Sequence, residues 1–119
     1  MAIVWKEINA VDNTPHLLQC KLNYNTLYIL FENPGATQLT FTAGSSMSAT
    51  PFKVEGCHTE TGEYTQLESK SVSQTSAEVS ADLLDSDGAA YKYIRITVTD
   101  SELLSSSSAT VDFKSISFT

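Results

Sequence analysis

The chain has 119 residues, a formal net charge of −7 and 41% hydrophobic residues, and charged residues make up only 18% of it. This length suits about one domain with its own hydrophobic core, so we expect residues 1–119 to form a single β-sandwich domain. The acidic balance argues against nucleic acid and anionic membranes as partners, because phosphate binding depends on Lys and Arg displacing counterions.

Alternation of apolar and polar side chains predicts strands along the whole chain, whereas no window of a dozen residues shows helical spacing with capping signals. The clearest case is AYKYIRITVTD, residues 90–100, in which Ile94, Ile96 and Val98 share one parity. The predicted strands are Ile3–Ile8, Leu17–Leu22, Thr26–Glu32, Gln38–Thr42, Phe52–His58, Tyr64–Glu68, Ala77–Leu83, Tyr91–Thr99 and Thr110–Phe118. Their spacing is that of a sandwich or barrel, and we predict an all-β, antiparallel β-sandwich.

Polar and glycine-containing segments predict the turns between these strands. Asn33-Pro34-Gly35 and Asp85-Ser86-Asp87-Gly88 are typical turn sequences, and Thr61-Gly62 predicts a hairpin between the fifth and sixth strands.

The last predicted strand changes parity along its length. Val111 and Phe113 share one parity, but Ile116 and Phe118 share the other. A β-bulge near Lys114 and Ser115 returns both pairs to one core, and the alternative is a strand end covered on both faces.

No apolar run reaches the roughly 18 residues that span a bilayer, so we expect no membrane insertion. Lys6 and Glu7 interrupt the first residues where a signal peptide needs an apolar segment, so we expect no export signal. The compartment stays unknown, with a virion among the alternatives. For Cys20 and Cys57 we expect two free, buried thiols rather than a disulfide, because a missing signal favours a reducing compartment.

Asp82, Asp85 and Asp87, with Gly88, form the best metal candidate of the sequence, since calcium takes several carboxylate and carbonyl oxygens from a tight loop. The alternative is a solvated acidic turn, because the spacing is not that of an EF-hand. We therefore expect no cofactor other than this candidate calcium ion.

Catalytic motifs are missing from the sequence. His58 lies beside Cys57 but no orienting group is readable for it, and His16 follows Pro15 in a predicted loop. No GxSxG, phosphate-loop or HExxH motif occurs, so we expect a protein that is not an enzyme.

The aromatic residues Trp5, Tyr24, Tyr28, Tyr64, Tyr91 and Tyr93 are candidates for stacking on a sugar ring. Tyr91, Tyr93 and Arg95 share the polar parity of one predicted strand and form the predicted ligand or partner contact. The alternative is cross-strand packing in which the Arg lies over a ring.

The second half of the chain, about Gln38 to Phe118, resembles the discoidin-like, or galactose-binding-like, β-sandwich family. The resemblance lies in LTFTA, FKVEGCHTETGEYTQLE, AYKYIRITVT and VDFKSISF, taken in this order. It implies a jelly roll and binding of glycans or other ligands through loops at one end, with calcium sites common in such domains. No binding residue of the family transfers to a position of this chain.

Three function classes follow from these observations. We favour a non-enzymatic structural or assembly module, such as a phage virion accessory or capsid decoration protein, with protein partners or further copies of the chain. The alternative is a carbohydrate-binding module whose partner is a glycan, and an enzyme comes third.

Overall fold

The computed structural model describes residues 4–10, 16–22, 27–47, 49–98 and 110–119, and for residues 4–10 and 21–22 it describes the backbone alone. These ranges contain strands, turns and irregular segments, and none holds a helix long and apolar enough to cross a membrane. The strands are β1 (Val4–Ala10), β2 (Leu17–Leu22), β3 (Leu27–Glu32), β4 (Gln38–Ser45), β5 (Thr50–Cys57), β6 (Thr65–Val72), β7 (Ala77–Asp82), β8 (Tyr93–Val98) and β9 (Thr110–Phe118).

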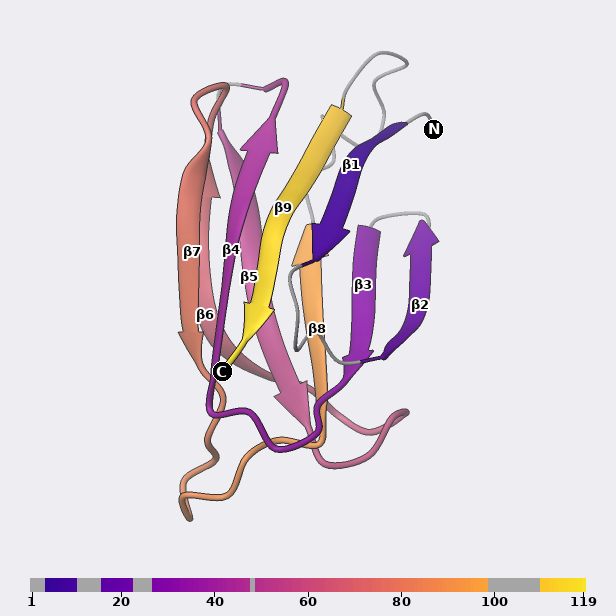
Figure 1. Ribbon diagram of the computed structural model, residues 1–119, viewed down its shortest axis with the longest axis vertical. Coiled ribbons are helices and arrows are strands. Elements are labelled where there is room, and N and C mark those ends of the chain that lie inside the picture. The colour runs from indigo at the N-terminus through magenta and orange to yellow at the C-terminus, as the bar shows by residue number, and fades with distance from the viewer. Residues whose placement is uncertain (1–3, 11–15, 23–26, 48, 99–109) are drawn as a thin grey trace.

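Two sheets face each other in a sandwich (Figure 1). One has the strand order β1-β9-β4-β7 and the other β2-β3-β8-β5-β6. The chain crosses repeatedly between the sheets, which is the arrangement of a jelly roll. The predicted all-β antiparallel sandwich is confirmed, with one exception: β1 pairs with β9 in parallel, whereas the other paired strands are antiparallel.

Several strands differ in extent from their predictions; β4, for example, continues to Ser45, three residues beyond its predicted end. β6 continues to Val72, four residues beyond its predicted end, although residues 65 to 71 are mostly exposed and do not alternate. β6 is an edge strand that pairs with β5 alone, so its hydrogen bonds hold it where no hydrophobic pattern marks it. β8 begins at Tyr93 rather than Tyr91, because the chain before it packs against the loop that follows β7.

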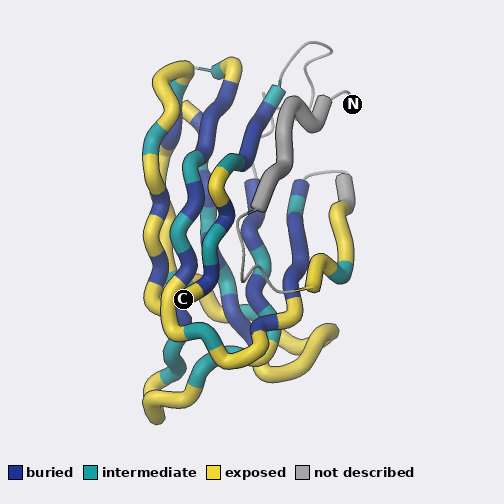
Figure 2. The backbone as a smooth tube through the Cα atoms, viewed as in Figure 1, coloured by how far each residue is buried: buried dark blue, intermediate teal, exposed yellow. Residues whose placement is uncertain are grey.

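Apolar side chains on the inward face of each strand fill the space between the sheets, and these buried residues are the dark blue stretches of Figure 2. Phe113 of β9 lies near its centre, with its ring centroid 5.5 Å from that of Phe52 and 6.1 Å from that of Phe41. Phe31 and Phe118 pack edge to face at 5.3 Å. Aromatic pairs from both sheets therefore join the two layers.

Of the two alternatives for the last strand, the structure has the bulge. Thr40 pairs with Ser117 and Thr42 with Lys114, so one residue of β4 lies opposite two residues of β9. Ser115 has φ 54°, in the left-handed region. This extra residue turns both Ile116 and Phe118 back into the core.

The predicted turns at 33–35 and 85–88 are also present. Asn33 Oδ1 accepts hydrogen bonds from the backbone N–H groups of Gly35 and Ala36, at 3.3 and 2.8 Å. Gly35 and Gly88 have φ of 112° and 82°, which a residue without Cβ adopts without steric cost. These turns fix the loops at one end of the sandwich.

Replacing Phe113 by Ala tests the central packing. The side chain is fully buried, so we expect the free energy of unfolding to fall by about 3–5 kcal/mol. Urea unfolding measures the change, with Ser80→Ala on the exposed face of β7 as the control. A loss no larger than that of the control contradicts this account of the core.

Candidate functional site

The outer face of the five-stranded sheet carries an arginine anchored by a carboxylate. Arg95 of β8 lies between Leu30 of β3 and Glu55 of β5 in the strand register. Its Nε donates a hydrogen bond to Glu55 Oε1 at 3.0 Å, and Thr97 Oγ1 donates to the same oxygen at 3.1 Å. Two cross-strand donors thus fix the carboxylate, and the carboxylate fixes the guanidinium.

Two tyrosine rings lie beside this guanidinium. The Arg95 Cζ atom is 4.1 Å from the ring centroid of Tyr64 and 5.8 Å from that of Tyr28, both within the range of cation–π attraction. Tyr28 donates its hydroxyl hydrogen to Gln19 Oε1 at 3.0 Å, and Tyr64 donates to the Glu60 carbonyl at 2.7 Å. Both rings are therefore held in place by their polar ends.

The hydroxyl group of Tyr64 is a neutral donor at ordinary pH. Desolvation by burial raises the pKa of Tyr64 to about 12, although the charge of Arg95 acts in the opposite direction. This phenol fixes the loop between β5 and β6 and carries no negative charge that a nucleophile or base would need.

A shallow hollow of about 220 Å³ opens beside these side chains. Gln19, Tyr28, Tyr64 and Arg95 line its polar side, and together with Glu55, which holds Arg95, we call them the Arg95 cluster. Leu30 also lines the hollow, and the loop residues 60–62 form its rim.

Gly62 allows this rim to lie close to the sheet. A Cβ at this position would collide with Thr59 Oγ1 and lie 2.8 Å from Cys57 Sγ. The glycine therefore lets the loop fold closely against Thr59 and the end of β5.

The charges around the hollow favour a neutral ligand. Glu55 offsets the charge of Arg95 by direct contact, and the rim residue Glu60 adds a second carboxylate. The whole chain carries a formal net charge of −7. An anionic ligand would meet repulsion here, whereas hydroxyl and amide groups find both donors and acceptors.

The structure corrects one member of the predicted contact stripe. Tyr93 lies on the outer parity of β8 with Arg95, but Tyr91 precedes the strand and packs against the core. A Cβ on Gly56, which lies on the core parity of β5, would be 2.7 Å from the Tyr91 ring. Tyr91 does not follow the parity of β8, because the strand begins two residues after it.

The sequence alone did not reveal the partners of Arg95. Tyr28 and Glu55 reach it through strand pairing, and Tyr64 reaches it from the loop between β5 and β6. A signal was present, because Tyr28 and Glu55 alternate with core residues of their own strands. Of the other candidates, Tyr24 and the side chain of Trp5 lie outside the described residues.

His58 has an orienting group that the sequence did not reveal. Its Nε2 lies 2.7 Å from Asp85 Oδ2, and its ring stacks on Tyr91 at a centroid distance of 4.8 Å. This pair joins the loop after β5 to the turn after β7. His16 is exposed, and its carbonyl accepts a hydrogen bond from the Glu32 N–H at 3.0 Å.

The acidic turn uses its central carboxylate for its own structure. Asp85 Oδ1 accepts hydrogen bonds from the N–H groups of Asp87 and Ala89 at 2.8 and 2.9 Å. Asp82 and Asp87 are exposed, and within the described ranges no three His, Cys, Asp or Glu residues are grouped as metal ligands. Calcium binding by Asp82, Asp85 and Asp87 stays a prediction.

The two cysteines are free thiols, as expected, but they differ in burial. Cys57 is buried and Cys20 is exposed on the edge strand β2. The expectation of two buried thiols is therefore wrong for Cys20, because an edge strand lacks a neighbour on one side.

Comparison with known proteins gives no family. No family model and no curated protein matches the chain. A GH29 fucosidase of Ruminococcus gnavus in complex with fucose is similar in structure with a TM-score of 0.49 and 16% identity, over 79% of this chain and 18% of that chain. A mutant of that fucosidase, also in complex with fucose, has a TM-score of 0.46 and 15% identity, over 80% of this chain and 18% of that chain. The chain spans less than a fifth of these proteins, and a likeness this low carries no functional argument.

The contact between His58 and Asp85 predicts a pH-dependent contribution to stability. Hydrogen bonds hold the pKa of Asp85 below its ordinary value of 3.8. The largest effect comes from the Ala89 N–H and the next from His58. Because the folded-state pKa is lowered, the stabilisation is present above 3.8 and is lost as the pH falls through the folded-state value.

We therefore expect Asp85→Asn to unfold at lower urea concentration than the parent protein near neutral pH, with the difference shrinking below pH 3.8. Urea unfolding over a series of acidic pH values measures this. Asp87→Asn, which removes the same charge from the same turn, is the control. A difference between parent and Asp85→Asn that stays constant down the series contradicts the assignment.

Proposed function

We propose that the protein is a non-enzymatic recognition module that binds a neutral, hydroxyl-rich ligand, a carbohydrate, at the Arg95 cluster. The observation that carries the proposal is the position of Arg95, held by Glu55 and flanked by Tyr64 and Tyr28 beside an open hollow. Half-buried aromatic rings offer apolar surface to a sugar, and the surrounding amide, carboxylate and guanidinium groups offer hydrogen bonds.

The charge of the Arg95 cluster supports this ligand class over others. With Glu60 on its rim and Glu55 paired with Arg95, the hollow opposes acidic sugars and phosphates. The alternative explanation is that Arg95 serves only cross-strand packing, and this alternative predicts a loss of stability without any effect on binding.

We also infer a relation to the discoidin-like β-sandwiches, on the sequence phrases between Gln38 and Phe118. The jelly-roll order of the strands is compatible with that relation. Fold alone supplies no site, so the functional proposal rests on the Arg95 cluster.

A glycan array with the labelled full chain tests the proposal. We expect selective binding of neutral glycans, and we expect Arg95→Ala to weaken it at least about tenfold, because hydrogen bonds to a charged group contribute about 1.5–3 kcal/mol. Lys92→Ala is the matched control, since it removes one positive charge from an exposed residue outside the hollow.

Tyr64→Phe separates the ring from its hydroxyl group. This variant keeps the aromatic face but loses the hydrogen bond to Glu60, so we expect weaker binding through a looser rim. Thermal unfolding of each variant shows whether it is folded. An array without selective binding, or equal binding by folded Arg95→Ala, overturns the proposal.

A second candidate is the structural or assembly role favoured by the sequence, and the edge of the five-stranded sheet supports it. β2 pairs with β3 on one side alone, and Leu17 of β2 is 41% exposed, the one exposed large apolar side chain of the residues described. An edge strand with an apolar side chain is a template for strand addition by another chain.

This candidate predicts self-association that depends on Leu17. We expect multi-angle light scattering to show a mass that rises with protein concentration, and Leu17→Asp to return it to that of the monomer. Thr65→Asp on the edge strand β6 introduces the same charge at the opposite edge and is the control. A mass of one chain at all concentrations contradicts the assembly role through this edge.

A further inference from the structure

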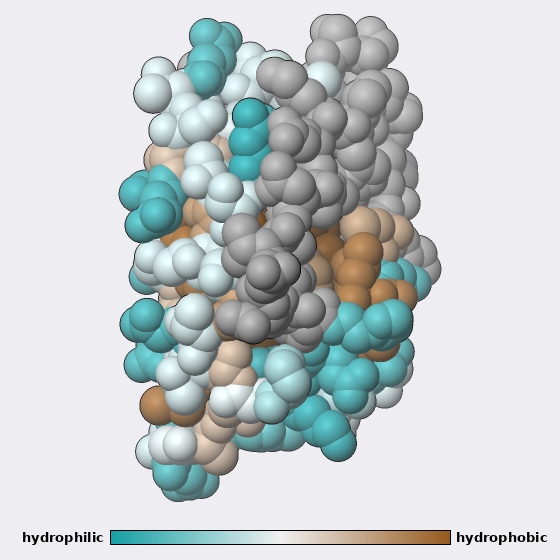
Figure 3. Space-filling view, in the orientation of Figure 1, coloured by the Kyte–Doolittle hydropathy of each residue, from teal (hydrophilic) through white to brown (hydrophobic). Residues whose placement is uncertain are grey.

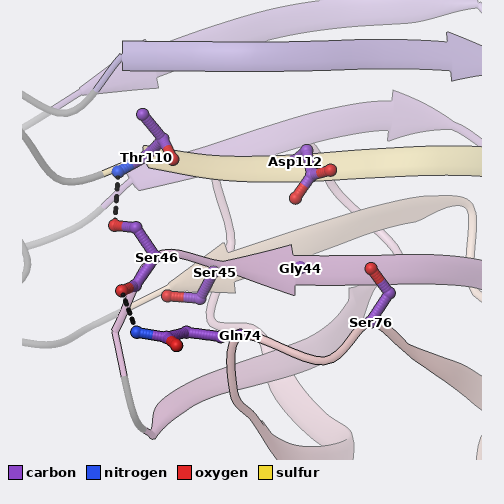
Figure 4. Close-up of a pocket in the computed structure, with 7 residues that line it drawn as sticks. All are labelled: Gly44, Ser45, Ser46, Gln74, Ser76, Thr110 and Asp112. Carbon is purple, nitrogen blue, oxygen red and sulfur yellow. Dashed lines mark hydrogen bonds between the residues drawn. The ribbon is translucent and has the colours of Figure 1, made fainter.

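A second hollow lies on the outer face of the other sheet, away from the Arg95 cluster. It has a volume of about 330 Å³, within the range of small-ligand sites of roughly 300–1,000 Å³. The end of β4, the segment between β6 and β7, and the start of β9 surround it (Figure 4). We call it the Asp112 hollow; its lining includes Gly44, Ser46, Gln74, Ser76, Thr110 and Asp112.

A largely buried carboxylate faces this hollow. Val111 and Phe113 point into the core, so Asp112 between them lies on the outer side of β9. Its side chain is nevertheless only 11% exposed. A carboxylate on the outer face of a sheet is ordinarily solvated, so this degree of burial distinguishes Asp112 from a surface acid.

Gly44 makes room for this carboxylate. Gly44 and Asp112 are register partners on β4 and β9, and a Cβ on residue 44 would collide with Asp112 Oδ1 and lie 3.3 Å from Ser76 Oγ. Figure 4 shows Asp112 and Ser76 on either side of Gly44. A glycine inside a strand costs about 0.5–1 kcal/mol relative to Ala, and it often marks a place where another group approaches the backbone closely.

Hydrogen bonds fix the rim of the hollow before any ligand binds. The Thr110 N–H donates to Ser46 Oγ at 2.9 Å, and Gln74 Nε2 donates to the Ser46 carbonyl at 3.1 Å. Beneath them Ser45 Oγ and Thr50 Oγ1 lie 2.7 Å apart. Three segments of the chain are thereby tied together, so little ordering is left for binding.

The polar groups of the hollow select the ligand class. A carboxylate accepts hydrogen bonds from two neighbouring hydroxyl groups, and the Ser76, Thr110 and Gln74 side chains both donate and accept. Lys114 Nζ stands 3.8 Å from Asp112 Oδ2, longer than a hydrogen bond, so that contact leaves the oxygen able to accept from a ligand.

Charged ligands fit the hollow less well. Asp112 and its ion-pair partner Lys114, 3.8 Å away, leave no net positive charge to attract an anion. Asp112 is also the one carboxylate of the described lining, which is fewer than a calcium ion takes. Figure 3 shows the surface over β4 and β7 as mostly white to teal, the colours of hydroxyl and charged residues, so an apolar ligand finds little complementary surface.

We propose that the Asp112 hollow binds a neutral sugar residue, with the Asp112 carboxylate accepting hydrogen bonds from two adjacent ligand hydroxyl groups. The site is independent of the Arg95 cluster, because the two lie on the outer faces of different sheets. A protein with both sites binds a branched or repeating glycan at two points, and its avidity then exceeds the affinity of either site.

Titration of the isotope-labelled full chain with neutral monosaccharides, followed by amide NMR shifts, tests this site. The probes are glucose, galactose, mannose, fucose and N-acetylglucosamine. We expect at least one of them to shift the signals of Gly44, Ser76 and Asp112. The same shifts should persist in Arg95→Ala, which separates this site from the Arg95 cluster.

Asp112→Asn keeps the shape of the side chain but removes the charge and one acceptor oxygen, so we expect binding at least about tenfold weaker. Asp87→Asn on an exposed turn removes the same charge and should leave the affinity unchanged. Ser76→Ala, a smaller change at the opposite wall, keeps the test valid if Asp112→Asn does not fold, and it should weaken binding too.

Two results overturn the proposal. One is that none of the probes shifts the signals of the hollow, whether or not those of the Arg95 cluster move. The other is that folded Asp112→Asn, or Ser76→Ala in its place, binds as tightly as the parent protein. If binding is lacking at the Arg95 cluster alone, the proposal for the Asp112 hollow is unaffected. That result contradicts only the function proposed for the Arg95 cluster.

Discussion

The structure depends on the packing of two sheets through aromatic side chains that come from both. Phe113 on β9 contacts the rings of Phe41 within its own sheet and of Phe52 across the sandwich. Once these rings are buried, the parity of their strands is fixed, and each neighbouring residue faces outward. Asp112 beside Phe113 is therefore on the outer face for the same reason that Phe113 is in the core.

The bulge at Ser115 preserves this arrangement to the end of the chain. Without the extra residue, Ile116 and Phe118 would face solvent, and the sandwich would lose its contact with Phe31 at that end. The cost is a non-glycine residue with positive φ. Burial of two large apolar side chains, at about 1.5–3 kcal/mol each, exceeds that cost of about 1–2 kcal/mol.

The two outer faces carry polar groups in different arrangements. At the Arg95 cluster a half-buried guanidinium is offset by Glu55, and the tyrosine hydroxyl groups are fixed by hydrogen bonds. At the Asp112 hollow a single carboxylate lies in a recess opened by Gly44. Both arrangements place hydrogen-bonding groups of low net charge around a concave surface, and the two proposals for neutral polar ligands rest on this shared feature.

The sequence by itself determined the fold class and the turns, because these follow from local alternation and from residues such as Asn33, Gly35 and Gly88 whose backbone preferences act locally. For the last strand it left two alternatives, and the register of β4 with β9 decided for the bulge. The sequence did not determine which outward residues meet. Arg95 was visible as a candidate, yet Glu55 joins it only through the pairing of β5 with β8, and Tyr64 only through the loop between β5 and β6. Tyr91 is not beside Arg95 on the strand, because β8 begins two residues after it. His58 with Asp85, and Asp112 over Gly44, are likewise pairs between distant segments. Tertiary structure decided them, since strand order and register set which side chains are neighbours and no local pattern encodes either.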